Sequence, residues 1–158
     1  EWAVILIGMY IERAIQIIRI INAKLHDVYK IEQSGHPVTE MSFEWTTLLR
    51  CVEAFDMNRK FYRNIPDCKQ VLEFLMLNPH CPRSISYSLN GIRRYEEKIS
   101  RNENHDSNAI SFKIGKLYEQ YRYLAFDDYK DDVYSLLNHT QNKVAEIGAE
   151  LEKKYFSF

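Results

Sequence analysis

The chain has 158 residues, with 21 Lys and Arg against 22 Asp and Glu, so its formal net charge is −1 with neutral histidines. At this length a single domain is expected, and a hydrophobic share of 46% with 27% charged residues excludes intrinsic disorder as the main state. The balanced charge lacks the positive excess of a nucleic-acid binder, and three cysteines without a Cys-x-x-Cys pair fit a reducing compartment, here the cytoplasm.

The first predicted helix begins inside an apolar run, residues 2–11. The run is shorter than the about 20 residues that a membrane span needs, and it lacks the basic flank and cleavage site of a signal peptide. A chain that opens inside a helix is expected to be part of a longer protein. Because the run is apolar on every side, we expect Trp2, Ile5 and Leu6 to need a partner surface, either a missing half of the protein or a second copy of this chain.

An apolar seam, spaced alternately four and three residues apart, continues this helix. It consists of Ile7, Ile11, Ala14, Ile18, Ile21, Leu25 and Val28. The helix is expected to run to about Glu32 and to stop at Ser34-Gly35-His36-Pro37, where a Gly cap precedes a proline.

The rest of the chain also shows helical spacing. Ser42 is a plausible N-cap for a second helix through Tyr62, Pro66 fits the first turn of a third, and Pro82 opens a fourth in which Gly91 indicates a close helix contact. A polar loop is expected at 101–108, a fifth helix over 110–124, and a sixth from Asp127-Asp128 to about Tyr155. With no convincing strand alternation, the sequence predicts one all-α domain over 1–158, a bundle of five to six helices.

Two adjacent charges, Glu12 and Arg13, interrupt the most apolar helix. Glu12, Gln16 and Arg19 are spaced to share one face beside the seam. They predict a buried or half-buried ion-pair network that fixes helix packing, a polar site between helices, or a plain solvated face. Adjacent helical residues point about 100° apart, so each charge needs its own partner. We expect Arg83 for Glu12, and Glu53 or a carboxylate of the sixth helix for Arg13.

Other polar segments are weaker candidates. Cys81-Pro82-Arg83-Ser84 begins a helix and suits either a phosphate or carboxylate site, with Arg83 and Ser84 as ligands, or a plain helix start. Residues 127–132 resemble an aspartate-rich magnesium–diphosphate motif, but acids at a helix N-terminus are the preferred interpretation. Cys68, His80 and Cys81 do not make a four-ligand zinc set. No metal and no cofactor are expected.

Several segments in order resemble the bacterial alpha-E domain family. They are Gly8-Met9-Tyr10-Ile11-Glu12-Arg13-Ala14, Trp45-Thr46-Thr47-Leu48-Leu49, residues 71–78 followed by Pro82-Arg83-Ser84-Ile85, and Ile147-Gly148 with Tyr155-Phe156 near the end. The form of these segments resembles the C-terminal half of such proteins. The family's Arg before the motif aromatic is Met9 here, and its acidic residue after Ala14 is Ile15.

The resemblance implies a helical module of unknown activity. Such domains are encoded or fused beside ATP-grasp ligases and transglutaminase-like proteins, which implies a role in a peptide or amide-bond-forming system. We expect a non-catalytic partner or substrate-binding component of an ATP-grasp amidoligase. The alternative is an enzyme with an inter-helical site, in which Glu12 is the acid or base and Arg13, Arg19 or Arg83 holds a carboxylate or phosphate. The expected partners are proteins, including a possible second copy, with neither nucleic acid nor membrane.

Overall fold

The computed structural model of the chain describes residues 2–34, 38–100 and 109–156. Within these ranges all regular secondary structure is helical, which confirms the all-α bundle, but there are seven α-helices rather than five or six. They are α1 Trp2–Gln33, α2 Val38–Cys51, α3 Phe55–Tyr62, α4 Cys68–Leu77, α5 Ile85–Ile99, α6 Ile110–Arg122 and α7 Val133–Phe156, with a short 3₁₀ turn at Phe126–Asp128. None of these described helices combines the length and apolarity needed to cross a membrane.

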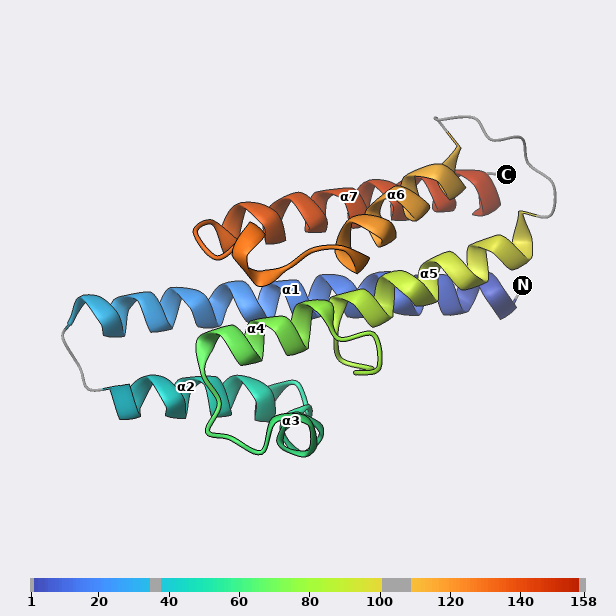
Figure 1. The fold of residues 1–158 in the computed structure, drawn as a ribbon. Helices are drawn as coiled ribbons and strands as arrows, with labels where there is room; N and C mark the ends of the chain where they lie inside the picture. The colour runs from blue at the N-terminus through green and yellow to red at the C-terminus, as the bar shows by residue number, and fades with distance from the viewer. Residues whose placement is uncertain (1, 35–37, 101–108, 157–158) are drawn as a thin grey trace.

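The bundle is organised around α1, which runs the length of the molecule (Figure 1). It packs most extensively against α5 and also contacts α7 and α2. Helices α6 and α7 lie on one side of the α1–α5 pair, and α2, α3 and α4 lie on the other (Figure 1). The first and last described helices therefore bring both chain ends to the same end of the bundle.

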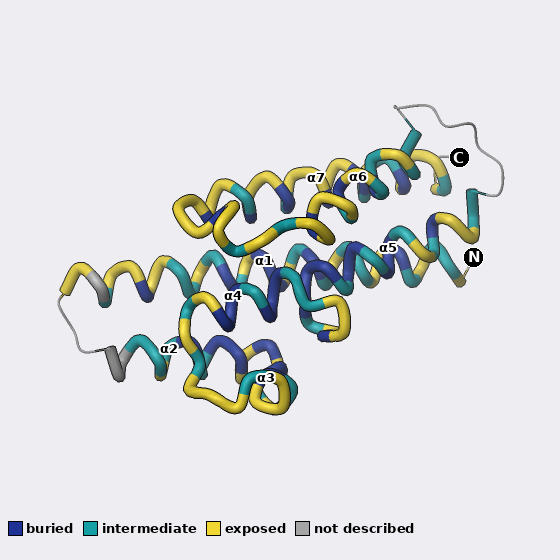
Figure 2. The backbone as a smooth tube through the Cα atoms, viewed as in Figure 1, coloured by how far each residue is buried: buried dark blue, intermediate teal, exposed yellow. Residues whose placement is uncertain are grey.

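The predicted seam of α1 is its core face. Ile7, Ala14, Ile18, Ile21 and Val28 are buried, and the other two seam residues pack against the same core. Figure 2 shows this buried face continuing into α5 and α4, while the outer sides of α1 and α7 are largely exposed. The predicted stop of this helix at 35–37 and the predicted loop at 101–108 lie outside the described residues.

The single helix expected from Ser42 to Tyr62 is wrong, because the chain breaks between α2 and α3. Glu53 has a left-handed backbone, with φ of 56°. Its N–H donates to the Arg50 carbonyl (3.0 Å), and the Ala54 N–H donates to the Leu49 carbonyl (2.8 Å). These two bonds are the Schellman ending of a helix, which normally places glycine at the left-handed position. Helix α2 also begins before Ser42, at Val38, and Met41 already packs against the core.

The sixth predicted helix begins later than expected. Its Asp127-Asp128 start lies in the 3₁₀ turn, and α7 begins at Val133. Asp128 accepts a hydrogen bond from the Ala125 N–H (2.8 Å), and Asp132 accepts one from the Ser135 N–H (2.9 Å), as an N-cap does. The acidic run therefore supplies side-chain caps at the starts of the 3₁₀ turn and of α7, in agreement with the preferred interpretation of the sequence.

Candidate functional site

A polar cleft of about 210 Å³ opens where α1 passes the end of α2 and the turn before α5. Its lining combines three charged side chains with an apolar wall: Arg13, Gln16, Ile17, Ile20, Cys51, Val52, Glu53 and Arg83. Two of the predicted site residues, Arg13 and Arg83, meet here. Glu12, Arg19 and Ser84 are not among the lining residues.

Arg13 is supported by aromatic rings. Its guanidinium lies 5.4 Å from the centroid of Tyr10, one turn earlier on α1. Tyr10 stacks on Tyr95 with centroids 5.9 Å apart, and its ring is 6.2 Å from that of Tyr87. Burial is the main cause that raises the pKa of Tyr10, with the neighbouring tyrosines adding to it and Arg13 opposing it. A guanidinium over an aromatic face is a favourable cation–π contact that leaves its N–H groups free to bind.

Arg83 is anchored by a carboxylate. Its guanidinium forms an ion pair with Glu53, the left-handed residue that ends α2. Glu53 was one of the partners expected for Arg13, and the structure gives this bond to Arg83 instead. The cleft therefore contains two guanidiniums and one carboxylate, and the carboxylate is already engaged.

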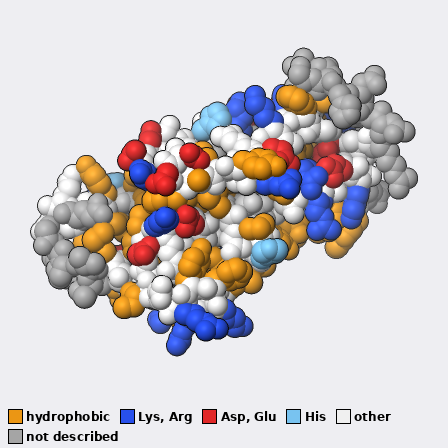
Figure 3. Space-filling model, viewed as in Figure 1, with side chains coloured by type: hydrophobic (Ala, Val, Ile, Leu, Met, Phe, Trp, Pro, Cys, Tyr) orange, Lys and Arg blue, Asp and Glu red, His pale blue; other side chains and the backbone are white. Residues whose placement is uncertain are grey.

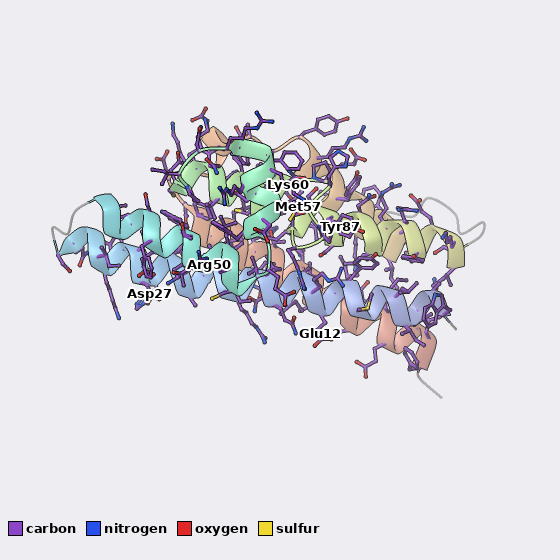
Figure 4. All side chains as sticks on the ribbon, turned by 90° about the horizontal axis from the view of Figure 1, so that it is seen from below. Glu12, Asp27, Arg50, Met57, Lys60 and Tyr87 are labelled. Atoms are coloured by element: carbon purple, nitrogen blue, oxygen red, sulfur yellow. The ribbon has the colours of Figure 1, made fainter. Side chains whose placement is uncertain are left out.

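The expected burial of Glu12 and its pairing with Arg83 are both wrong. Glu12 is exposed and accepts a hydrogen bond from Gln16 on its own helix (3.1 Å). Figure 4 shows Glu12 on the outer side of α1, whereas Tyr87 lies toward the other helices. Arg19 is also exposed. Glu12 and Arg19 each come one residue after a half-buried or buried isoleucine. The rotation of about 100° between successive helical residues turns them out of the core.

Ser84 has a structural role. It is fully buried at the N-cap of α5, where its hydroxyl accepts from the Tyr87 N–H (3.0 Å) and donates to the Asn78 carbonyl (2.5 Å). Both capabilities of the hydroxyl are thus used inside the protein. Of the two ligands predicted for a phosphate or carboxylate, Arg83 and Ser84, only Arg83 therefore lines the cleft.

Sequence reasoning missed two members of the site. Tyr10 supports Arg13, and the signal was available, since residues three apart share a helix face. Cys51 is the last residue of α2 and lines the cleft, and no local pattern indicated it. Across the described ranges, no group of three or more His, Cys, Asp or Glu is placed to hold a metal ion. Figure 3 shows acidic and basic side chains intermixed over most of one face, with a basic cluster over α3.

The exposed position of Glu12 leads to a stability prediction. Glu12→Ala should change the free energy of unfolding by less than about 0.5 kcal/mol, as a surface substitution does. Glu96→Ala is the matched contrast, because Glu96 is buried and accepts hydrogen bonds from Ser100 and Ser111. It should lose more than about 1 kcal/mol through the unsatisfied hydroxyls. Urea unfolding of both variants measures the difference, and equal losses would contradict the exposed placement of Glu12.

The thiols of Cys51 and Cys81 should differ in reactivity. Cys51 is exposed in the cleft, whereas Cys81 is buried and burial raises the pKa of its thiol. Because the thiolate is the reactive form, N-ethylmaleimide should modify Cys51 more than about tenfold faster than Cys81. Mass spectrometry of a labelling time course gives both rates, with C51S as the control that removes the fast phase. Equal rates in the folded chain would show that Cys81 is not enclosed.

Comparison with known proteins gives a family. No curated protein and no solved structure matches the chain. A protein-family model described as a predicted alpha-helical domain with a conserved ER motif matches residues 1–156. Glu12-Arg13 is the only Glu-Arg pair in the sequence, so the motif corresponds to the outward-facing Glu12 and the cleft residue Arg13. With its whole helical bundle covered by this match, the chain belongs to the Alpha-E family.

Proposed function

We propose that this chain is a non-catalytic binding module of a peptide-ligase system, in which the cleft holds a carboxylate-bearing segment of a protein or peptide. The observation that supports this most directly is the surplus guanidinium of Arg13 beside the Arg83–Glu53 ion pair. The family resemblance suggests an ATP-grasp amidoligase as the partner, and a module of this kind would bind the ligase or its peptide substrate.

The chemistry of the cleft suits a carboxylate. A guanidinium binds a carboxylate through two parallel hydrogen bonds, and these charge-assisted bonds are stronger than neutral ones. Arg13 is half-buried on Tyr10, which fixes its position at little cost in side-chain freedom. Ile17, Ile20 and Val52 supply an apolar wall beside it. Ligand sites typically combine such a wall with a few placed polar groups.

Glu53 supports a role in binding rather than only in packing. A non-glycine residue in the left-handed region costs about 1–2 kcal/mol, and such residues tend to cluster at functional sites. Only Glu53 and Arg63 have positive φ among the described non-glycine residues. Glycine at position 53 would relieve the backbone but would leave Arg83 without its carboxylate. The residue with the strained backbone thus supplies the carboxylate that keeps the Arg83 guanidinium oriented in the cleft.

The alternative is an enzyme whose inter-helical Glu/Arg site acts on a peptide or amide. A general base must reach the substrate and be free to take a proton. Glu12 lies outside the cleft lining and Glu53 is paired with Arg83, so the geometry favours binding over catalysis. Turnover of a peptide or amide by the chain alone, abolished in Glu53→Gln, would support the enzyme instead.

The experiment measures affinity for an ATP-grasp ligase of the kind that the family resemblance suggests, together with ATP consumption by that ligase. We expect co-purification, and we expect Arg13→Met to raise the Kd about tenfold, which is the size of a lost charged hydrogen bond. Arg59→Met, at an exposed arginine outside the cleft, should leave the Kd nearly unchanged. Failure of the parent chain to bind the ligase, or equal effects of the two variants, would contradict the proposal.

Backbone-matched variants give a second test. Glu53→Gly and Arg63→Gly both relieve a left-handed residue, so both should leave the chain as stable as the parent or more so. Only Glu53→Gly should weaken ligase binding, because only position 53 lines the cleft. If both variants bind like the parent, Glu53 has no part in the site.

A further inference from the structure

The outward face of α1 carries a regular stripe of exposed residues that the cleft does not explain. The stripe is spaced alternately three and four residues apart along the helix and consists of Trp2, Ile5, Met9, Glu12, Gln16, Arg19, Ala23, His26 and Lys30. This spacing is the seam of a two-helix contact, in which positions recur every 3.5 residues on average. All nine residues are exposed, so no other described helix covers them.

The N-terminal third of the stripe is unusual for a solvent-facing helix. Trp2 is 70% exposed, Ile5 60% and Met9 42%. Beside them, Gly8 has nothing within 4 Å of the place where a Cβ would stand, so another backbone can approach closely. An apolar patch of this kind indicates an interaction surface. Of the three residues expected to need a partner surface, Trp2 and Ile5 are exposed and Leu6 is half-buried.

The charged residues of the stripe indicate which kind of partner binds this face of α1. Glu12 and Arg19 lie seven residues apart with Gln16 between them, and neither has a salt-bridge partner within the described chain. We propose that two copies of this chain associate through α1 in an antiparallel pair, with Glu12 of each copy facing the partner's Arg19. Two-fold symmetry then gives two copies of this ion pair in the interface.

Antiparallel pairing gives every residue of the stripe except Lys30 a counterpart on the partner helix. In the register that places Ile5 opposite the partner's Ala23, Trp2 lies opposite the partner's His26 and Met9 opposite the stem of the partner's Arg19. Each apolar residue thus meets a small or amphipathic one. At a rise of about 1.5 Å per residue, Glu12 is then offset from the partner's Arg19 by about 4.5 Å along the axis, within reach of two long side chains.

The parallel arrangement is excluded by charge. A two-fold parallel pair places each residue opposite its own copy, so Glu12 would face the partner's Glu12 and Arg19 the partner's Arg19. Like charges across an interface are unfavourable. Figure 4 shows Glu12 and Asp27 along the outer edge of α1, where both are exposed.

Sedimentation velocity of the 158-residue chain over a concentration series tests the proposal. We expect a concentration-dependent dimer. Glu12→Arg and Arg19→Glu should each raise the dimer Kd at least about tenfold, since each places like charges together twice, and the double variant E12R/R19E should recover to within about threefold of the parent. Glu119→Arg with Arg122→Glu is the matched control, an exposed pair on α6 whose reversal should change nothing. Circular dichroism verifies that every variant is folded.

Cross-linking fixes the orientation. In a C51S background, I5C combined with A23C should form an intermolecular disulfide, whereas I5C alone should not. A chain that stays monomeric at all concentrations would overturn the proposal, and so would single variants that dimerise like the parent. Efficient self-cross-linking of I5C would overturn the antiparallel arrangement. The apolar residues of the stripe could instead bind the ligase. In that case the chain alone stays monomeric and Trp2→Ala weakens the complex with the ligase, and this result also refutes the dimer.

Discussion

Ser84→Ala is expected to lower the free energy of unfolding by about 2–4 kcal/mol, because one hydroxyl performs two tasks at the start of α5. As the N-cap it accepts from the Tyr87 N–H, and as a donor it satisfies the Asn78 carbonyl. Loss of an N-cap alone costs about 1 kcal/mol, and the carbonyl of the half-buried Asn78, left without its donor, costs about 1–3 kcal/mol more. The residue is fully buried, so water does not readily replace either bond.

Asp67→Ala is the matched control for Ser84→Ala. Asp67 is the N-cap of α4, is exposed, and accepts a single hydrogen bond from the Gln70 N–H (2.8 Å). Its loss should cost about 1 kcal/mol. Urea unfolding at constant m-value gives both free energies, and the difference between the two variants measures the bond to Asn78. A loss no larger than that of Asp67→Ala would show that the Asn78 carbonyl finds another donor.

The long helix could be predicted well because its signal repeats. The seam of α1 extends over a helix of 32 residues, and each turn adds an independent observation of the same core face. The break between α2 and α3 had no such support. The left-handed position that ends a helix usually contains glycine, but here it is Glu53, so the stop has no local mark in the sequence.

The site was only partly predictable for a related reason. The sequence identified Arg13 and Arg83, but which of them meets Glu53 depends on how the α2 end approaches the turn before α5. Ser84 was expected in the first turn of a helix opened by Pro82, but α5 begins three residues later, at Ile85, which makes Ser84 the N-cap with its hydroxyl turned inward. Such differences in position decide whether a polar side chain is available to a ligand.

Gly91→Ala is expected to lower the free energy of unfolding by about 1–3 kcal/mol, even though alanine is the better helix former by about 1 kcal/mol. A Cβ at position 91 would stand 2.7 Å from three atoms of the Tyr10 ring, closer than real contacts allow. The ring has little freedom to retreat, because it stacks on Tyr95 and approaches Tyr87. The contact confirms the close helix approach that the sequence predicted at Gly91.

The overlap at Gly91 also reaches the cleft. Tyr10 supports the Arg13 guanidinium, so a displaced ring moves the group that we propose as the carboxylate ligand. Gly91→Ala should therefore weaken ligase binding although residue 91 does not line the cleft. A purely structural effect on the α1–α5 contact would lower stability and leave the affinity of the folded fraction unchanged.

Gly115→Ala separates the overlap from helix propensity. Gly115 also lies inside a helix, but nothing is within 4 Å of its would-be Cβ. Alanine there should raise the free energy of unfolding by about 0.5–1 kcal/mol. In a Tyr10→Ala background, Gly91→Ala should become stabilising by a similar amount, since the ring that opposes it is gone. Urea unfolding of the four variants completes the cycle, and a loss at Gly91 that persists without the Tyr10 ring would assign the cost to another neighbour.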